Sequence, residues 1–407
     1  MKFSEYRLSD EIKRNLSEMS FKRPTDIQYK SIPHIQRGED LLAIAQTGTG
    51  KTAAFAIPII DKIQQIKYKT KTQAIRALVM VPTRELATQI SQVFNQIGKH
   101  TKVKTLSVYG GVEQEPQIAR LLAGVDVLVS TPGRMFDLVH QGYIKLNKIE
   151  VLILDEADHM LDLGFNKDIQ DLVRLLPKRR QTLFFSATID KKIKKLAYAL
   201  VRDAIRIQIS PKDPVSKNVN HQVISVEMDD KRFFLQRLIE ENSAMKFLVF
   251  VRTKVRAERV KSALERLNVS SATIHGDKDQ VDRETTLAKF KNGENLVLIA
   301  TDVSARGIDI PDVDYVVNYD LPEKPENYVH RVGRTGRGTK KGQALSFCSS
   351  GEKEYLKEIE ELITLPITRA KITKAEYSEI IELEQDSKDD WRALMDLDLK
   401  PKKKRKK

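Results

Sequence analysis

The feature that most constrains the fold is a series of short, strand-prone apolar runs, each followed by a longer amphipathic or polar stretch. Alternation of this kind predicts βαβ units and a parallel sheet. The first five runs are Leu41–Ala45, Ala77–Val81, Val125–Ser130, Val151–Leu154 and Thr182–Ser186. The alternation stops near Ile209 and resumes with Phe247–Val251, Ser271–His275, Leu296–Ala300, Tyr315–Asn318 and Gly342–Phe347. The sequence therefore predicts two α/β domains.

The expected domain boundaries follow the breaks in this pattern. Residues 1–208 form the first expected domain and residues 221–368 the second. Residues 209–220 between them indicate an interdomain linker, because the segment is polar and is interrupted twice by proline. From about Thr368 the apolar runs cease, so we expect residues 369–407 to form a helical and then charged extension outside both cores.

The charge balance favours an anionic partner. The chain has 70 Lys and Arg residues against 56 Asp and Glu residues, a formal net charge of +14. Half of that excess lies in Lys400–Lys407, so the rest of the chain is only mildly basic. This excess of positive charge is consistent with binding to nucleic acid, but it is equally consistent with a basic surface that contacts only solvent. The basic end likewise has two interpretations, an RNA-binding or nuclear-localisation patch or a solubilising tail.

The cysteine content and the hydropathy indicate in which cellular compartment the protein is expected. Cys348 is the only cysteine, so an intramolecular disulfide and a cysteine-rich zinc site are both excluded. No apolar run approaches the roughly 20 residues needed to cross a bilayer, and the first residues contain no apolar signal segment. We therefore expect a cytoplasmic protein of a reducing compartment, with no membrane partner.

A glycine-rich segment between one apolar run and an expected helix is typical of a phosphate-binding loop. Its residues are Ala45, Gln46, Thr47, Gly48, Thr49, Gly50, Lys51 and Thr52. In such a loop backbone N–H groups converge on nucleotide phosphates, Lys51 reaches the β- and γ-phosphates, and the Thr52 hydroxyl binds Mg²⁺. Taken alone, the segment is also compatible with a glycine-rich turn before a helix.

Two carboxylates support a nucleotide site. The run Val151–Leu154 ends in Asp155 and Glu156, which places them at the carboxyl end of a strand, where open α/β sheets bind ligands. We expect Asp155 to bind Mg²⁺ and Glu156 to act as the general base that polarises the attacking water. A helix cap is the alternative for one carboxylate, but it leaves the upstream glycine-rich segment unexplained.

The order of these motifs resembles that of the DEAD-box ATP-dependent RNA helicases, and the resemblance spans residues 3–350. The acidic motif Asp155–Asp158 reads Asp-Glu-Ala-Asp, the letters that name the family. The resemblance implies two tandem RecA-like parallel-sheet domains, joined by a short linker and followed by a short helical and charged tail. It also implies an RNA-stimulated ATPase with ATP and Mg²⁺ as cofactors.

The segment upstream of the glycine-rich loop is similar to the family's Q motif. It covers Phe21–Gln28, with Phe3 as a separate upstream aromatic residue and Ser20 where the family usually has glycine. The resemblance implies that these residues recognise adenine. An amide such as Gln28 both donates and accepts hydrogen bonds, and Phe21 offers a packing face, so ATP is favoured over GTP.

Further segments of the first domain are similar to motifs that contact RNA or couple it to ATP. The implied RNA contacts are Pro82, Thr83, Arg84, Gly110, Gly111, Thr131, Gly133 and Arg134. Hydroxyls, glycine-rich turns and arginines suit phosphate and sugar contacts and do not read bases, so the binding is expected to be largely sequence-independent. Individually each segment is also compatible with a turn or helix cap. Ser186 and Thr188, with Asp158, match the motif that couples hydrolysis to strand separation.

The second domain supplies the remaining motifs of the resemblance. Its implied RNA contacts are Thr253, Gly276, Gln280, Arg283, Thr301 and Asp302, and Asp309 is implied to face the ATP ribose. Ser304 stands where the family more often has alanine. His330, Arg334 and Arg337 match the arginine-finger motif, in which guanidinium groups from the other domain stabilise charge during phosphoryl transfer. Hydrolysis would then depend on domain closure.

The sequence thus predicts an ATP-dependent RNA helicase that closes two domains on RNA and unwinds short duplexes or remodels RNA–protein complexes. A weakly enzymatic RNA clamp is the main rival, although a degenerate member should lack a catalytic residue and this chain retains all of them. A DNA helicase of the same superfamily is disfavoured by the Q motif and the acidic motif. The compact core most resembles the bacterial RhlE-type subgroup, which implies roles in ribosome assembly or RNA turnover, with ribosomal precursors or RNA-decay proteins as partners.

Overall fold

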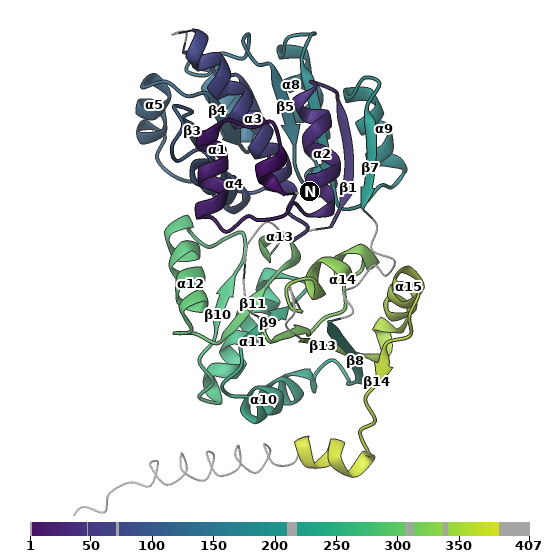
Figure 1. Cartoon of the computed structure of the whole chain (residues 1–407). Coiled ribbons are helices and arrows are strands. Elements are labelled where there is room, and N and C mark those ends of the chain that lie inside the picture. The colour runs from purple at the N-terminus through teal and green to yellow at the C-terminus, as the bar shows by residue number, and fades with distance from the viewer. Residues whose placement is uncertain are drawn as a thin grey trace, which may run out of the picture. The chain divides into compact units, whose positions relative to one another are not determined.

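The chain divides into two compact units, each built around its own parallel sheet (Figure 1). The computed structural model describes residues 2–46, 48–70, 73–209, 218–305, 310, 313–336 and 341–381. Most of the predicted linker (residues 210–217) and the end of the predicted extension (residues 382–407) lie outside these ranges, so the domain boundaries stay predictions. Every helix in the described ranges is too short or too polar to cross a bilayer.

The first unit contains seven parallel strands in the order β3-β4-β2-β5-β6-β1-β7. They are β1 (Leu41–Ala45), β2 (Ala77–Met80), β3 (Thr105–Val108), β4 (Val127–Ser130), β5 (Val151–Leu154), β6 (Gln181–Ser186) and β7 (Ile205–Ile209). The five inner strands are almost wholly buried, which explains why they read as continuous apolar runs. Crossover helices that cover both faces of the sheet cause this burial.

Successive residues of each inner strand face two separate cores. Leu41 and Ala43 pack with the first group of helices, whereas Leu42 packs with the second. The first group is α1 (Asp10–Glu18), α2 (Asp26–Gln36), α3 (Lys51–Lys69) and α4 (Arg84–Ile97), preceded by the short helix η1 (Phe3–Glu5). The second is α5 (Glu115–Leu122), α6 (Pro132–His140), α7 (Ala157–Asp162), α8 (Asn166–Leu175) and α9 (Lys191–Leu200).

The second unit repeats the strand order of the first. Its sheet runs β10-β11-β9-β12-β13-β8-β14, so β8 to β14 occupy in turn the places of β1 to β7. The strands are β8 (Val219–Ser225), β9 (Phe247–Phe250), β10 (Ala272–Ile274), β11 (Val297–Ala300), β12 (Tyr315–Asn318), β13 (Gly342–Cys348) and β14 (Thr368–Arg369). Both sheets are the α/β, RecA-like parallel sheets that the sequence predicts.

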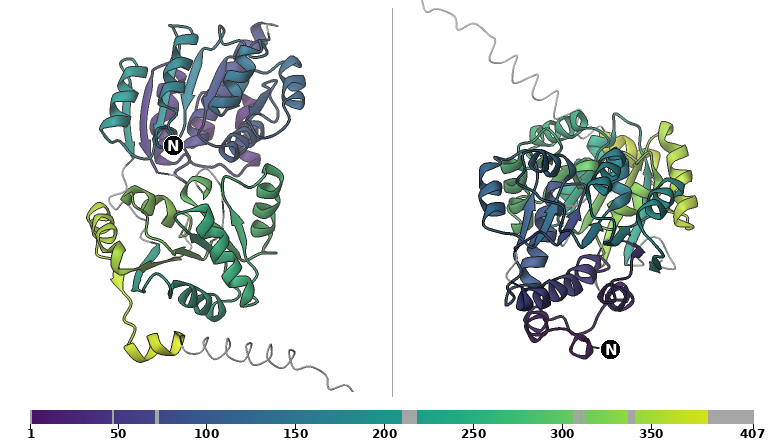
Figure 2. Two further views of the ribbon diagram at one scale, coloured as in Figure 1. Left: turned by 180° about the vertical axis from the view of Figure 1, so that it is seen from behind. Right: turned by 90° about the horizontal axis from the view of Figure 1, so that it is seen from above.

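Helices also cover both faces of the second sheet. Helices α10 (Lys231–Glu241) and α11 (Lys254–Arg266) share one core and lie in front of the sheet in the left view of Figure 2. Helices α14 (Pro325–Val332) and α15 (Lys353–Ile363) share the other. The remaining elements are α12 (Gln280–Asn292), α13 (Asp302–Ala305) and η2 (Ser350–Glu352).

The predicted extension begins differently from the expectation. Thr368 and Arg369 do not start a helix; they form β14, which pairs with Gln222 and Val223 of β8. A helix follows at residues 374–381, and Tyr377 packs on Phe234 of α10 with a ring distance of 5.0 Å. The first part of the extension therefore belongs to the core of the second unit, because its apolar side chains complete the layer over α10.

Candidate active site

The glycine-rich loop joins the end of β1 to the start of α3, as predicted. Gly48 and Gly50 have φ values of +82° and +92°, which only glycine adopts without strain. The Thr49 hydroxyl donates to the carbonyl of Gln46 at 2.8 Å, and Lys51 is the first residue of the helix. The loop thus aims the N-terminus of a 19-residue helix at the carboxyl edge of the sheet. Thr47 lies outside the described residues.

Lys51 and Asp155 form the electrostatic centre of this edge. The Lys51 ammonium is buried, and its Nζ has no hydrogen-bond partner among the residues that the structure describes. Asp155, which directly follows β5, is also buried. Burial raises its pKa from 3.8 to about 6, and the charges of Glu156 and Asp158 add to the rise, while Lys51 and the Glu156 N–H oppose it. Both groups are therefore desolvated without a full set of partners.

Glu156 adopts a conformation that is unusual for a residue with a side chain. Its φ of 50° and ψ of 49° lie in the left-handed region, and its N–H donates to Oδ1 of Asp155 at 3.0 Å. The side chain is mostly buried, with Oε2 3.4 Å from Nδ1 of His159. A strained backbone held in place by its surroundings is a frequent property of reactive sites.

The Q-motif residues lie directly beside the glycine-rich loop. Gln28 Nε2 donates to the carbonyl of Gly50 at 3.1 Å, and Gln28 Oε1 accepts from the N–H of Thr25 at 2.9 Å. A Cβ on Gly50 would lie 2.5 Å from Gln28 Nε2, so glycine permits this close approach. An amide has a second hydrogen and a second lone pair, so Gln28 retains capacity to bind a ligand.

The aromatic residues of the Q motif pack together. The rings of Phe3 and Phe21 are 6.1 Å apart; Phe3 is buried and Phe21 is partly exposed. Ser20 has a φ of 59°, in the left-handed region that favours glycine. This explains physically why the family usually has glycine at this place.

The acidic motif is bonded to the predicted coupling motif. Asp158 Oδ2 accepts from the N–H groups of Ala187 and Thr188, each at 3.1 Å, and from the Thr188 hydroxyl at 3.2 Å. The Ser186 hydroxyl is buried, with no hydrogen-bond partner among the described residues. The structure thus brings Asp158 and Thr188 together, and Ala187, the middle residue of the same motif, contributes its backbone N–H.

The three RNA-motif segments of the first unit gather at one edge of the sheet. Pro82, Thr83 and Arg84 follow β2, Gly110 and Gly111 follow β3, and Thr131 to Arg134 follow β4; these strands are neighbours in the order β3-β4-β2. Thr83 caps α4 by accepting from the N–H of Leu86 at 3.3 Å. Thr131 is the N-cap of α6, and Gly133 is exposed in its first turn.

Two arginines connect these segments. Arg84 lies so close to Gly111 that a Cβ there would collide with the guanidinium group, and Gly111 has a φ of +77°. Arg134 Nη2 donates to the carbonyl of Val112 at 2.8 Å. Three segments that are far apart in sequence therefore form one polar surface with two guanidinium groups.

The second unit repeats this arrangement. Thr253 follows β9, Gly276 lies beyond β10, and Thr301 follows β11, which again are three neighbouring strands. Thr253 and Gly276 are exposed, and Thr253 caps α11 by accepting from the N–H of Arg256 at 3.2 Å. Gln280 and Arg283 lie in the first turn of α12, where Gln280 Nε2 donates to Glu284 at 2.8 Å.

Asp302 has a structural partner that the sequence did not single out. Arg331 donates from Nε to Asp302 Oδ1 at 2.6 Å and from Nη2 to Oδ2 at 2.8 Å, and Asn327 donates to Oδ2 at 3.2 Å. The Arg331 guanidinium is buried and stacks on Phe250. The basic run after Tyr328 therefore contains an arginine that holds its own unit together, and charge pattern alone does not separate it from its neighbours.

The other arginine-finger residues are only partly described. His330 belongs to the last turn of α14, and Arg334 lies two residues beyond that helix, with its N–H bonded to the carbonyl of Arg331 at 3.1 Å. Arg337 and Asp309 lie outside the described residues.

Comparison with known proteins supports one family. The family model "DEAD/DEAH box helicase" matches residues 25–196, and "Helicase conserved C-terminal domain" matches residues 230–339. The ATP-dependent RNA helicase CshA of Listeria monocytogenes is 41% identical over 360 residues, which are 88% of this chain and 68% of that protein. RhpA of Helicobacter pylori, a DEAD-box ATP-dependent RNA helicase, is 38% identical over 95% of this chain and 77% of its own length.

A solved structure agrees with these relatives. Saccharomyces cerevisiae Dbp5 bound to RNA and ADP BeF3 superposes with a TM-score of 0.82 at 30% identity, covering 95% of this chain and 99% of the yeast chain. The sequence motifs, the two repeated sheets and these relatives agree. The chain belongs to the DEAD-box ATP-dependent RNA helicases, which are RNA-stimulated ATPases.

Proposed function

We propose that Lys51, Thr52, Asp155 and Glu156 form the hydrolytic centre of the enzyme. The observation that carries this proposal is the buried Lys51 ammonium, which has no hydrogen-bond partner among the described residues and lies on the same sheet edge as Asp155. A buried unpaired charge is costly, so this arrangement suits the negative charge of a ligand. The β- and γ-phosphates of ATP supply that charge, and Glu156 orients and deprotonates the attacking water.

The residues at this edge fit Mg²⁺. The described residues contain no cluster of three or more His, Cys, Asp or Glu side chains that would hold a metal by themselves. Mg²⁺ needs less from the protein, since it is usually bound by one or two side chains together with waters and phosphate oxygens. The Asp155 carboxylate and the Thr52 hydroxyl would hold it. Bound there, Mg²⁺ would neutralise charge that develops on the phosphate oxygens.

Adenine recognition is assigned to the Q-motif residues. Gln28 keeps one donor and one acceptor beyond its bonds to Gly50 and Thr25. Phe21 is the partly exposed member of the aromatic pair with Phe3 and is available to pack on a base. The backbone N–H groups from Gln46 to Gly50 would bind the phosphates.

RNA is proposed to bind along the strand ends that carry Thr83, Arg84, Gly110, Gly111, Thr131, Gly133 and Arg134 in the first unit and Thr253, Gly276, Gln280, Arg283 and Thr301 in the second. Asp302 is proposed to face RNA as well, and Arg331, which bonds its carboxylate, would hold it in place beside Thr301. These groups suit backbone contacts, which favours binding without sequence preference.

Domain closure is proposed to connect the two ligands. Arg334 and Arg337, with His330, would complete the ATP site from the second unit, and Asp309 would contact the ribose. The bonds from Asp158 to Ala187 and Thr188 provide a rigid link from the acidic motif to the coupling motif. Neither ligand alone gathers all contacts, so RNA should stimulate hydrolysis by favouring the closed state, which strains an RNA duplex and releases one strand.

Steady-state ATP hydrolysis tests this function most directly. The purified chain is assayed alone, with saturating RNA and with single-stranded DNA of the same sequence, and Glu156→Gln serves as the blank. Strong stimulation by RNA only is the expected result. Equal rates in all three conditions would contradict the assigned RNA contacts. RNA binding without turnover would favour the rival clamp, and normal turnover in Glu156→Gln would refute the general-base role.

The cellular role is a separate proposal. We propose an RhlE-type enzyme that acts in the cytoplasm in ribosome assembly or RNA turnover, with ribosomal precursors or RNA-decay proteins as partners. The resemblance of the two-domain core to that subgroup supports this assignment. Crosslinking the enzyme to RNA in its native cell and sequencing the bound RNA tests it. Enrichment of precursor ribosomal RNA or of decay intermediates is expected, and enrichment of neither would refute the role.

A further inference from the structure

The second unit contains a counterpart of the lysine–aspartate arrangement in the ATP site. Lys231 is the first residue of the helix that follows β8, just as Lys51 is the first residue of the helix that follows β1. Asp320 lies just beyond β12, and Asp155 just beyond β5. Since β8 and β12 occupy the sheet positions of β1 and β5, the same topology places a lysine and an aspartate at the carboxyl edge of each sheet.

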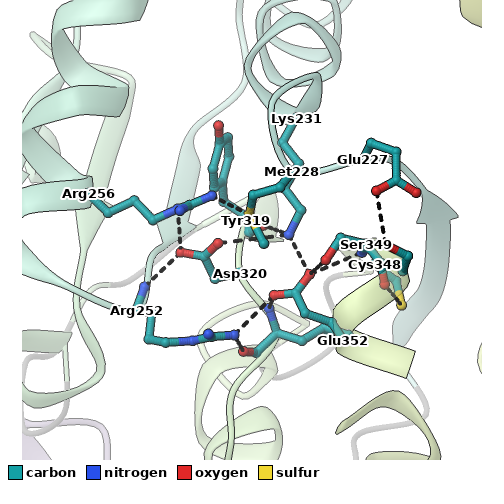
Figure 3. Close-up of polar contacts among 12 residues, drawn as sticks. Glu227, Met228, Lys231, Arg252, Arg256, Tyr319, Asp320, Cys348, Ser349 and Glu352 are labelled. Carbon is teal, nitrogen blue, oxygen red and sulfur yellow. Dashed lines mark hydrogen bonds and ion pairs between the residues drawn. The ribbon is translucent and has the colours of Figure 1, made fainter. Parts of the chain in front are cut away.

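The two lysines differ in their partners. Lys231 is fully buried, and its Nζ donates to Glu352 Oε2 at 2.6 Å and to the carbonyl of Tyr319 at 2.7 Å (Figure 3). Asp320 Oδ1 lies 3.8 Å from the same Nζ. Lys51 has no such partner among the described residues. Glu352 therefore supplies, from within the second unit, the negative charge that the first unit takes from a ligand.

Glu352 is bonded as a charged group. Besides Lys231, it accepts from the N–H and the hydroxyl of Ser349 at 3.1 and 2.9 Å and from the N–H of Leu321 at 3.1 Å. Burial alone would raise the pKa of its carboxyl, but the hydrogen bond and charge of Lys231 lower it below its usual value. An ion pair bonded this fully can fix the position of the segments that meet at it.

The segment fixed in this way carries Thr253. Asp320 Oδ2 accepts from the backbone N–H of Arg252 at 3.0 Å and pairs with Arg256 Nε at 2.9 Å. Glu352 Oε1 accepts from Arg252 Nη2 at 3.2 Å (Figure 3). Arg252 precedes Thr253, and the Arg256 N–H donates to the Thr253 hydroxyl. Arg252, directly before Thr253, is thus bonded to both carboxylates, and Arg256, three residues after it, is bonded to Asp320.

We propose that Lys231, Asp320 and Glu352 are positioning residues for RNA binding, because their ion-pair cluster holds the loop that presents Thr253. This inference rests on the proposed contact of Thr253 with RNA. The buried cluster itself makes no contact with RNA and leaves nucleotide binding by the first unit unchanged.

The test compares RNA affinity and ATPase activity of Glu352→Gln with those of wild type. Glutamine preserves the shape of the side chain but leaves the Lys231 charge without Glu352 as its counter-charge. We expect RNA affinity to fall about tenfold, as for the loss of one coupled contact, with an equal rise in the RNA concentration that half-stimulates the ATPase. The RNA-independent ATPase rate should stay at the wild-type value. The salt dependence of RNA binding should also be unchanged, since no phosphate contact is removed.

Matched variants separate the possible failures. Glu241→Gln breaks the exposed ion pair between Glu241 and Arg237, whose atoms are 2.7 Å apart on α10, the helix that begins with Lys231. This variant should bind RNA as wild type does. Thr253→Ala tests the assumption beneath the inference, and wild-type RNA affinity in that variant would refute the role of Thr253 itself. If Thr253→Ala weakens binding while folded Glu352→Gln does not, the positioning role is refuted.

A second variant covers the case in which Glu352→Gln does not fold. Arg252→Gln removes the contact with Glu352 without leaving the buried Lys231 unpaired, because the Arg252 side chain is 35% exposed and Lys231 keeps Glu352. RNA affinity should again fall with an unchanged salt slope. A salt slope smaller by about one unit would mean that Arg252 itself contacts a phosphate, and this outcome would also overturn the positioning role.

Discussion

Asp155→Asn should stabilise the nucleotide-free protein while it abolishes ATP hydrolysis. The Asp155 carboxyl is buried, and burial raises its pKa from 3.8 to about 6. At neutral pH the folded protein must therefore keep a carboxylate ionised in a place that disfavours the charge. Asparagine has nearly the same shape as the neutral acid, so it removes that cost but cannot bind Mg²⁺ as a carboxylate does.

The magnitude follows from the difference between the two pKa values. A shift from 3.8 to about 6 is about two units, and at 1.36 kcal/mol per unit the ionised group costs about 3 kcal/mol of folding free energy at pH 7.5. The folded state binds the proton more tightly, so the stability linked to protonation is present below pH 3.8 and is lost as the pH rises through about 6. The advantage of asparagine should therefore be largest above pH 7 and should fade as the pH is lowered toward 4.

Differential scanning calorimetry in EDTA without nucleotide measures this effect. The transition of the first unit is identified by its upward shift when ATP is added. For a unit of about 200 residues, 3 kcal/mol corresponds to a rise of roughly 6–12 °C in Tm at pH 7.5. The rise should be about half as large at pH 5, where the folded carboxyl is largely protonated but the unfolded one is still ionised.

A second buried aspartate of the same unit is the control. Asp40 accepts from the N–H groups of Thr182 at 2.7 Å and Arg202 at 2.8 Å, so its carboxylate has the partners that Asp155 lacks. Asp40→Asn should lower stability by about 1–3 kcal/mol, because at least one charged hydrogen bond is lost. The reasoning is refuted if Asp155→Asn destabilises the apoprotein at pH 7.5, or if its effect is the same at pH 5 and pH 7.5.

Three further predictions concern two single positions and the basic C-terminal segment. Ser20→Gly should raise the free energy of unfolding by about 0.5–1 kcal/mol, because the φ of 59° strains serine; urea titration measures it, and a destabilised variant would contradict the strain. Gly111→Ala should weaken RNA binding several-fold, because the added Cβ displaces Arg84. Gly142→Ala should leave RNA binding unchanged, because Gly142 has a φ of +81° but open space around its Cβ. If fluorescence anisotropy gives equal RNA affinities for the two variants, Arg84 does not contribute to RNA binding. Deleting Lys400–Lys407 should lower RNA affinity and its salt dependence if the basic end binds RNA; unchanged affinity would leave it a solubilising tail.

Burial explains which strands could be predicted from the sequence. All ten expected runs coincide with strands, and among them β1, β5 and β12 agree with the expected limits at both ends. The strands that were missed are β3, β7, β8 and β14, which lie at or beside the edges of the two sheets. Their residues are partly exposed, and β14 has only two residues. A mixed polar segment of this kind carries no continuous apolar signal and is recognised only through its neighbours.

Among the functional residues, too, those with a local sequence pattern could be predicted and those without one could not. The glycine-rich loop and the acidic motif could be predicted because each is a short contiguous segment whose local conformation requires particular residue types, as at Gly48 and Gly50. Arg331 was missed because its partners, Asp302 and Asn318, come from other elements. Lys231 and Glu352 were missed for the same reason, since 121 positions separate them. Isolated charged residues have no local pattern that distinguishes a buried pair from a solvated surface.

The repeated topology gives these observations a common physical basis. Each sheet presents a buried lysine at the start of the helix after its first strand, and a buried cation requires a nearby anion. In the second unit Glu352 provides the anion, so that unit is electrostatically complete without a ligand. In the first unit the described residues leave Lys51 Nζ without a hydrogen-bond partner and Asp155 with a raised pKa, so stability is lower until phosphate and Mg²⁺ arrive. ATP with Mg²⁺ and no RNA should therefore raise the Tm of the first unit only. An equal rise in both transitions would mean that the second unit also lacks a charge partner.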